Sequence, residues 1–279
     1  MTAIGGACKR PQHPGLWMMF AILLLAASAR AAIVSVTPLA DAFITTGPSG
    51  NLSPNNYGGA GALAISGSSA SKGIFDAVIR FDLSSVKSSF DKTYGGGWAV
   101  QSITLKLFAT SPNNATFNAQ SSGLFSIVWM QDDNWIEGSG SPNAPGATGI
   151  TYASLPSFLG ADDQALGTFA FDASAAGGDG VASSFSLSLA GGILSDIQAG
   201  SLASIELFAA TDAVSYLFNS SNFQMASRRP VLTIVAVSEP GASLLLCAAG
   251  AFIALMRNAL RRKENGDCRS LSNLKYNGS

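Results

Sequence analysis

Carboxylates are the acid–base groups that the central part of this chain offers. Residues 32–237 contain no histidine and no cysteine, so a Ser-His-Asp triad, a Cys-His pair and a histidine-ligated zinc site are excluded there. Asp132, Asp133 and Glu137 lie close together in the sequence, beside Trp135. Paired carboxylates next to an aromatic ring fit a sugar-cleaving site, but a solvated acidic loop has the same composition. We therefore expect no catalytic residue, and a carboxylate-dependent polysaccharide hydrolase or lyase is the alternative.

Calcium is the metal that these side chains suit, because Ca²⁺ binds several carboxylate and carbonyl oxygens. The candidate ligands lie in loop-like stretches and are Asp132, Asp133, Asp162, Asp163, Asp172 and Asp179. Their spacing is neither that of an EF-hand nor that of a nonapeptide Asp repeat. No cofactor is therefore certain. The alternatives are a Ca²⁺ site and a purely structural or surface role for these acids.

The charge of the same segment limits its partners. Residues 32–237 hold seven basic and fourteen acidic residues, a net charge of −7, whereas the whole chain has a formal charge of −1 because its ends are basic. Binding nucleic acid requires a basic face that neutralises phosphates, so we expect no nucleic-acid partner. Neutral glycans and Ca²⁺ are compatible with this charge.

The first 31 residues predict a secretory signal peptide. Lys9 and Arg10 form a basic start, residues 16–27 are apolar, and Ala29 and Ala31 provide a small-x-small cleavage site. We expect cleavage after Ala31, with an uncleaved anchor as the alternative.

The C-terminal part predicts a membrane span. An apolar run at 241–256 is followed by a basic cluster of Arg257, Arg261, Arg262 and Lys263. We expect a transmembrane helix at 241–260, because residues 259–260 extend the apolar run toward the ~30 Å of a hydrocarbon core. The positive-inside rule places the basic cluster and the polar tail 264–279 in the cytoplasm, and residues 32–237 outside. The alternative is a buried C-terminal helix of a soluble domain.

The exported segment, residues 32–237, predicts one all-β domain. Apolar or alternating runs are separated by Gly, Ser, Asn and Pro clusters, which is typical of a sandwich or barrel. Residues 103, 105 and 107 are apolar and alternate with polar residues, as in a strand with one buried face. Helices should be few, with single turns at 84–90 and 196–202. The candidate strands are 33–36, 41–45, 62–65, 77–82, 102–109, 123–129, 168–172, 184–189, 204–209 and 230–235.

Residues 238–263 resemble the PEP-CTERM sorting signal of exported Gram-negative proteins, a segment also named the ice-binding protein C-terminal domain. A Glu-Pro pair, a short apolar span at 244–256 and a basic end carry the resemblance, through Glu239, Pro240, Arg261, Arg262 and Lys263. It implies recognition by an exosortase-type membrane transpeptidase, which cuts near the Glu-Pro pair and delivers the protein to the cell surface. The chain has no regular Thr ladder, so the second name implies no ice binding.

Blocks of the central segment, taken in order, resemble the DNRLRE domain. They include Asn-Asn-Tyr-Gly at 55–58 and Ser-Arg-Arg-Pro at 227–230, and in full are residues 41–44, 55–58, 63–65, 77–83, 102–107, 135–138 and 226–232. The resemblance implies a jelly-roll sandwich similar to carbohydrate-binding modules, some of which bind alginate-type polysaccharides. The aromatic residues that would then contact a glycan are Tyr57, Trp98, Trp129, Trp135 and Tyr152.

Together these features predict a non-catalytic protein of the bacterial cell envelope, cell surface or extracellular matrix. We expect it to be anchored transiently in the inner membrane, sorted by an exosortase-type system, and able to bind extracellular polysaccharide. The alternatives are the carboxylate-dependent hydrolase or lyase and a structural surface protein that binds no ligand.

Overall fold

The computed structural model describes residues 30–68, 71–110, 117, 123–171, 181–239, 253, 256 and 257. Residues Ala31–Ser238 form one compact unit. Residues 1–29 of the predicted signal peptide, most of the predicted span at 241–260 and the tail 264–279 lie outside the described residues. Within the described part of the chain, no helix is long and apolar enough to cross a membrane.

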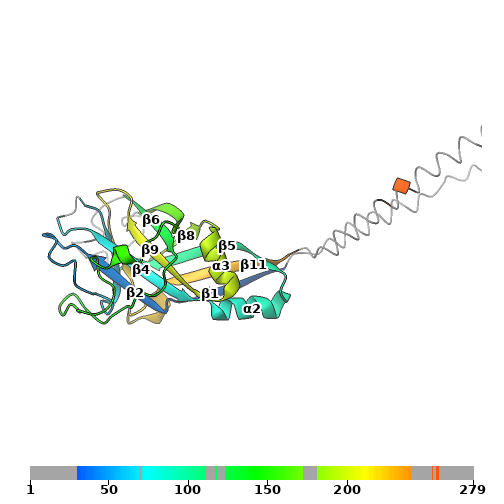
Figure 1. The fold of residues 1–279 in the computed structure, drawn as a ribbon, viewed down its shortest axis with the longest axis horizontal. Coiled ribbons are helices and arrows are strands. Elements are labelled where there is room, and N and C mark those ends of the chain that lie inside the picture. The colour runs from blue at the N-terminus through cyan, green and yellow to red at the C-terminus, as the bar shows by residue number, and fades with distance from the viewer. Residues whose placement is uncertain are drawn as a thin grey trace, which may run out of the picture. The chain divides into compact units, whose positions relative to one another are not determined.

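Residues Ala31–Ser238 form two antiparallel sheets (Figure 1). The four-stranded sheet has the order β1 (Ala31–Val36), β11 (Val231–Ser238), β5 (Trp98–Phe108) and β8 (Ala182–Leu187). The seven-stranded sheet has the order β10 (Ser215–Asn219), β3 (Ala62–Ser66), β4 (Phe75–Asp82), β9 (Leu202–Ala209), β6 (Gly123–Met130) and β7 (Gln164–Phe171), and β2 (Ala40–Thr45) pairs with β4. The predicted all-β sandwich is confirmed.

The main core lies between the two sheets. In β5 the alternation predicted from the sequence is present, because Ile103, Leu105 and Leu107 are fully buried and the intervening side chains face away from the core. Phe125 of β6 meets Phe185 of β8 edge to face, with ring centroids 5.1 Å apart. Apolar side chains from both sheets join this one cluster. Removal of this apolar surface from water is the main stabilisation of the fold.

Two helices border the sandwich: α2 (Ser84–Tyr94) follows β4 and α3 (Gly191–Ala199) precedes β9. Both are longer than the single turns expected from the sequence. Two buried indoles tie them to the sheets. Trp98 donates its Nε1–H to Asp91 of α2 at 2.8 Å, and Trp129 donates to Asp196 of α3 at 2.7 Å. These bonds satisfy polar groups that would otherwise be costly to bury.

The connection between β6 and β7, residues 131–163, covers the outer face of the seven-stranded sheet, and we call it the covering loop. It contains the short 3₁₀ helix η1 (Leu155–Ser157); a second one, η2 (Ala226–Arg228), precedes β11. Trp135, Ile150 and Leu155 of the loop pack on apolar side chains of β2 and β4. This contact is a second core on the outer side of the sheet.

Arg80 of β4 fixes the start of the covering loop. Its guanidinium lies 4.6 Å from the ring centroid of Trp135, a distance at which cation–π attraction operates. Its Nη1 donates to the carbonyl oxygens of Asp133 at 2.6 Å and Trp135 at 2.7 Å. The Trp135 indole in turn donates to Ser204 of β9 at 2.9 Å.

Asn56 fixes the middle of the covering loop. Its side chain is fully buried and donates to the carbonyls of Glu137 at 2.7 Å and Ile150 at 2.8 Å. The same side chain accepts from the backbone N–H groups of Gly58 and Gly140. The covering loop is therefore held by polar contacts at its start and in its middle, and by apolar contacts of Trp135, Ile150 and Leu155.

Candidate functional site

A pocket of about 480 Å³ opens between the covering loop, the outer face of the seven-stranded sheet and the connection that follows β3. Small-molecule sites occupy about 300–1,000 Å³, so the volume suits a ligand of that size. Side chains from β4, β9 and the covering loop meet here, although they are far apart in the sequence. The pocket is the candidate functional site.

Two carboxyl side chains, Asp76 of β4 and Glu206 of β9, lie in this pocket. Glu206 is opposite Val78 in the β4–β9 register, and Asp76 is two residues along β4 from Val78. The two acids are therefore diagonal neighbours on one sheet face, a relation that places two residues about 7–8 Å apart, with their Cβ atoms somewhat closer.

Both acids are largely buried, and their carboxyl groups face the pocket. Asp76 is 7% exposed and Glu206 is 6% exposed. Among the described residues, none donates a hydrogen bond to either carboxyl group. Neither carboxyl group is among the fully buried polar atoms without a partner in the described part of the chain, so their oxygens reach the open space of the pocket. A ligand in the pocket would supply the missing donors.

Burial changes the acidity of the pair. Burial, and to a smaller extent the nearby Glu206 charge, raise the pKa of Asp76 to about 8. Burial also raises the pKa of Glu206 to about 7, with a contribution from Asp163. Loss of hydration and like charge both disfavour the carboxylate form. Near neutral pH, the pair can therefore both donate and accept hydrogen bonds.

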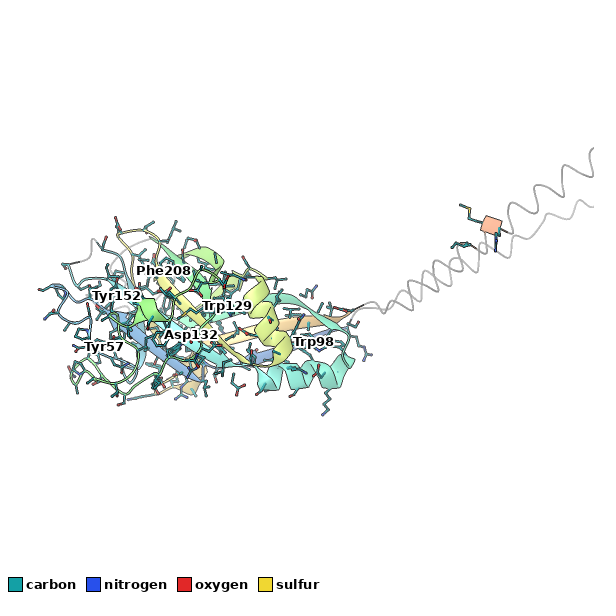
Figure 2. All side chains as sticks on the ribbon, viewed as in Figure 1. Tyr57, Trp98, Trp129, Asp132, Tyr152 and Phe208 are labelled. Atoms are coloured by element: carbon teal, nitrogen blue, oxygen red, sulfur yellow. The ribbon has the colours of Figure 1, made fainter. Side chains whose placement is uncertain are left out.

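The other walls of the pocket are mostly apolar. Tyr152, Leu155, Pro156 and Leu159 come from the covering loop, and Phe208 comes from β9; Figure 2 labels Tyr152 and Phe208. Burial raises the pKa of the Tyr152 phenol, and so do the two acids. An apolar wall beside a few polar groups is the usual character of a small-molecule site, and it suits a sugar ring with its apolar faces and polar rim.

The five aromatic residues predicted to contact a glycan occupy different environments. Tyr152 is partly exposed and lines the pocket. The other four are buried, with exposed fractions of 4%, 7%, 7% and 1% for Tyr57, Trp98, Trp129 and Trp135. Tyr57 stacks on Phe43 of β2 at a centroid distance of 4.7 Å. Figure 2 shows Trp98 at the end of the domain that carries α2 and Tyr152 at the other end.

The carboxylates considered as metal ligands serve local backbone contacts. Asp132 accepts from the N–H of Asn134 at 2.8 Å, and Asp163 accepts from the N–H groups of Gln131 and Gly160. Asp162 is exposed. Asp172 and Asp179 lie outside the described residues. In the part of the chain that the structure describes, no group of three or more His, Cys, Asp or Glu side chains could hold a metal ion.

Asp133 and Glu137, the acids considered for catalysis, are also held by the fold. Burial raises the pKa of Asp133, against the opposing effects of a hydrogen bond from Ser204 and the nearby Arg80 charge. Glu137 accepts from the N–H of Asp41 at 3.2 Å and from the side chain of Asn222 at 3.0 Å. Neither acid lines the pocket.

The sequence analysis did not single out Asp76 or Glu206. The available signal was an acid inside an apolar strand, as in Phe75-Asp76-Ala77 and Ile205-Glu206-Leu207. Charged side chains are rarely fully buried unless they are paired, so an acid inside an apolar strand is a candidate for a functional position. Their pairing across β4 and β9 depends on strand register, which the sequence pattern does not provide.

A scan against protein-family models returned no match for this chain, and a search of curated proteins also found none. Of the predicted sorting-signal residues, Glu239 is described and exposed. Pro240, Arg261, Arg262 and Lys263 lie outside the described residues.

Proposed function

We propose that this protein is an exported, non-catalytic surface or matrix protein whose sandwich domain binds extracellular polysaccharide in the Asp76–Glu206 pocket. We further propose that the domain is a jelly roll, as its resemblance to the DNRLRE domain implies. The sheet orders support this, because the sheet β1-β11-β5-β8 shares one core with the longer sheet β10-β3-β4-β9-β6-β7. A jelly roll consists of two packed sheets that share eight strands in two Greek keys.

The bounds of the folded unit support export and sorting. Its first strand begins at Ala31, beside the proposed signal-peptide cleavage site, and its last strand ends at Ser238, beside Glu239. The first strand, β1, is an edge strand and pairs along its whole length with β11, from Ala31 opposite Val237 to Val36 opposite Leu232. Cleavage at both proposed positions by a signal peptidase and an exosortase-type enzyme would therefore leave the sandwich strands almost intact.

The observation that carries the binding proposal is the pocket itself. It combines two unpartnered buried carboxyl groups with an aromatic and aliphatic wall. Sugar hydroxyls would hydrogen-bond to Asp76 and Glu206, and the apolar face of the ring would pack on Tyr152 and Leu159. Buried polar groups that a ligand must pair also provide selectivity, because a ligand without matching groups leaves them unsatisfied.

A carboxylate-dependent hydrolase or lyase is the second candidate, and the same pair favours it. Glycoside hydrolysis uses two carboxyl groups, one of which is protonated with a raised pKa. Near pH 7, Asp76 would be the protonated member, because its pKa is about 8 and that of Glu206 is about 7. Release of reducing ends that disappears in Glu206→Gln would support this candidate over simple binding.

The binding proposal is tested by retention of the full-length protein on a panel of immobilised polysaccharides. Leu159→Ala removes a side chain that lines the pocket and is 38% exposed, and Leu189→Ala is its matched control, 43% exposed and outside the pocket. We expect Leu159→Ala and Tyr152→Ala to weaken retention at least tenfold and Leu189→Ala to leave it unchanged. Equal retention of all three variants would refute binding in this pocket, and no retention of the native protein would favour a ligand-free structural role.

A further inference from the structure

We infer that the glycan bound in this pocket carries a free, positively charged amino group, as a deacetylated hexosamine does. This inference rests on the proposed polysaccharide-binding function and names the chemical class of its ligand. It is argued from the charge of the pocket, the missing hydrogen-bond donors and the shape of the walls.

Apart from the Tyr152 phenol, every ionisable side chain in the pocket wall is a carboxylic acid. Asp76, Glu206 and Asp212 line it, and Asp163 lies close enough to raise the pKa of Glu206. Among the described residues that line the pocket, none is Lys, Arg or His. Uronate, sulfate or phosphate groups would be repelled, because like charges at short range in a partly buried site are costly. The pocket therefore favours a cationic ligand over an anionic one.

The missing partners of Asp76 and Glu206 are donors, and a primary ammonium group offers three N–H donors on one atom. A single ammonium between these diagonal neighbours on the sheet face could donate to the Glu206 carboxylate and to an oxygen of the Asp76 carboxyl group. Such charge-assisted hydrogen bonds are roughly twice as strong as neutral ones. The ammonium would also favour ionisation of both acids, because an opposite charge stabilises the carboxylate form, which a neutral hydroxyl does only in part. An N-acetylated sugar has one amide N–H and no charge at this position.

The walls fit the rest of such a sugar. The phenol of Tyr152 and the ring of Phe208 lie in the wall with Leu155 and Leu159. The apolar face of a pyranose would pack on these side chains, and an ammonium near an aromatic ring gains additional cation–π attraction. The acids would thus recognise the amino group while the wall recognises the ring.

Binding of an ammonium group also depends on pH, because it requires at least one ionised acid. The ionisable side chains in the pocket wall are Asp76 from β4, Glu206 from β9, Tyr152 from the covering loop and Asp212 after β9, and Asp163 of the covering loop lies near Glu206. Glu206 has a pKa of about 7, against about 8 for Asp76, and ionises first. Its ionised fraction rises from about 1% at pH 5 to about half at pH 7, so the apparent affinity should increase about 50-fold.

The test compares two sets of β-1,4-linked glucosamine oligosaccharides of equal length, one fully deacetylated and one fully N-acetylated. Binding to the full-length protein is measured by isothermal titration calorimetry at pH 5 and pH 7. We expect the deacetylated set to bind at pH 7 at least tenfold more tightly than the N-acetylated set, and to weaken about 50-fold at pH 5. Glu206→Gln should lose the preference, whereas Asp162→Asn, which removes an exposed acid outside the pocket, should keep it.

The outcomes test the amino-group inference separately from the proposed polysaccharide binding. Equal or tighter binding of the N-acetylated set would overturn the amino-group inference and leave polysaccharide binding in place. A preference that persists in both Glu206→Gln and Asp76→Asn would overturn the assignment to this pocket and indicate general attraction to the acidic surface. Failure of the native protein to bind any glycan of the panel would overturn the proposed function as well. Thermal unfolding of each variant shows whether a loss of binding reflects a loss of fold.

Discussion

Replacement of Asp76 by Asn should make the free energy of unfolding of the protein decrease less as the pH rises toward 8. Burial and the nearby Glu206 raise the pKa of Asp76 from 3.8 to about 8 in the folded state. Because the folded-state pKa lies above the unfolded one, the stability associated with the protonated carboxyl is complete below about pH 4 and is lost as the pH rises toward 8. Asn is neutral throughout this range and has nearly the same shape.

The magnitude follows from proton linkage. Between the two pKa values, each pH unit costs about 1.4 kcal/mol of unfolding free energy per group. From pH 5 to pH 8 the native protein should therefore lose about 4 kcal/mol through Asp76, which corresponds to a fall in melting temperature on the order of 10 °C for a domain of this size. Asp41 also has a raised pKa of about 7, and it affects native protein and variant alike, whereas Glu206 interacts with Asp76 and belongs to the effect being measured.

The assay is urea unfolding at pH 5, 6, 7 and 8, followed by tryptophan fluorescence. The difference in unfolding free energy between Asp76→Asn and the native protein should increase by about 4 kcal/mol over this range in favour of the variant. Asp162→Asn, a change at an exposed acid, should give a difference that does not vary with pH. Parallel pH profiles for Asp76→Asn and the native protein would refute the buried, unpartnered state of this carboxyl group.

Three further outcomes are expected. Asn56→Asp should destabilise the protein by about 3 kcal/mol in urea unfolding, because the carboxylate cannot donate to the carbonyls of Glu137 and Ile150; an unchanged midpoint would contradict the role of Asn56 in holding the covering loop. Gly192→Ala should destabilise by several kcal/mol, on the order of overpacking a core, because a Cβ there would lie 2.2 Å from the Trp129 ring; Gly191→Ala, whose Cβ would approach no atom closer than 3.8 Å, is the matched control. Mass spectrometry of the protein recovered from cell envelope and medium should find a species that begins at Ala32 and ends near Glu239 and Pro240, whereas retention of residues 244–279 would contradict processing of the tail.

The sequence by itself determined the fold class and most of the strands. All ten predicted strands are present, with ends that differ by a few residues. The local signals were sufficient there, because alternation and the intervening turn residues depend on neighbours in the chain. The eleventh strand, β10, was missed because Ser215-Tyr-Leu-Phe-Asn has no alternation and is buried at four of its five positions. The absence of His and Cys from residues 32–237 also limited the chemistry to carboxylates.

The tertiary structure alone decided which residues form the site. Most of the aromatic residues that suggested glycan contacts are buried anchors, and only the packing of the covering loop on β2, β4 and β9 leaves Tyr152 at a pocket. Asp76 and Glu206 are 130 residues apart in the sequence, and the β4–β9 register places them on one sheet face. Local sequence patterns report the periodicity of a strand but not its partner, its register or the loop that covers it. For this reason the sequence predicted the sandwich, and only the folded chain revealed the pocket.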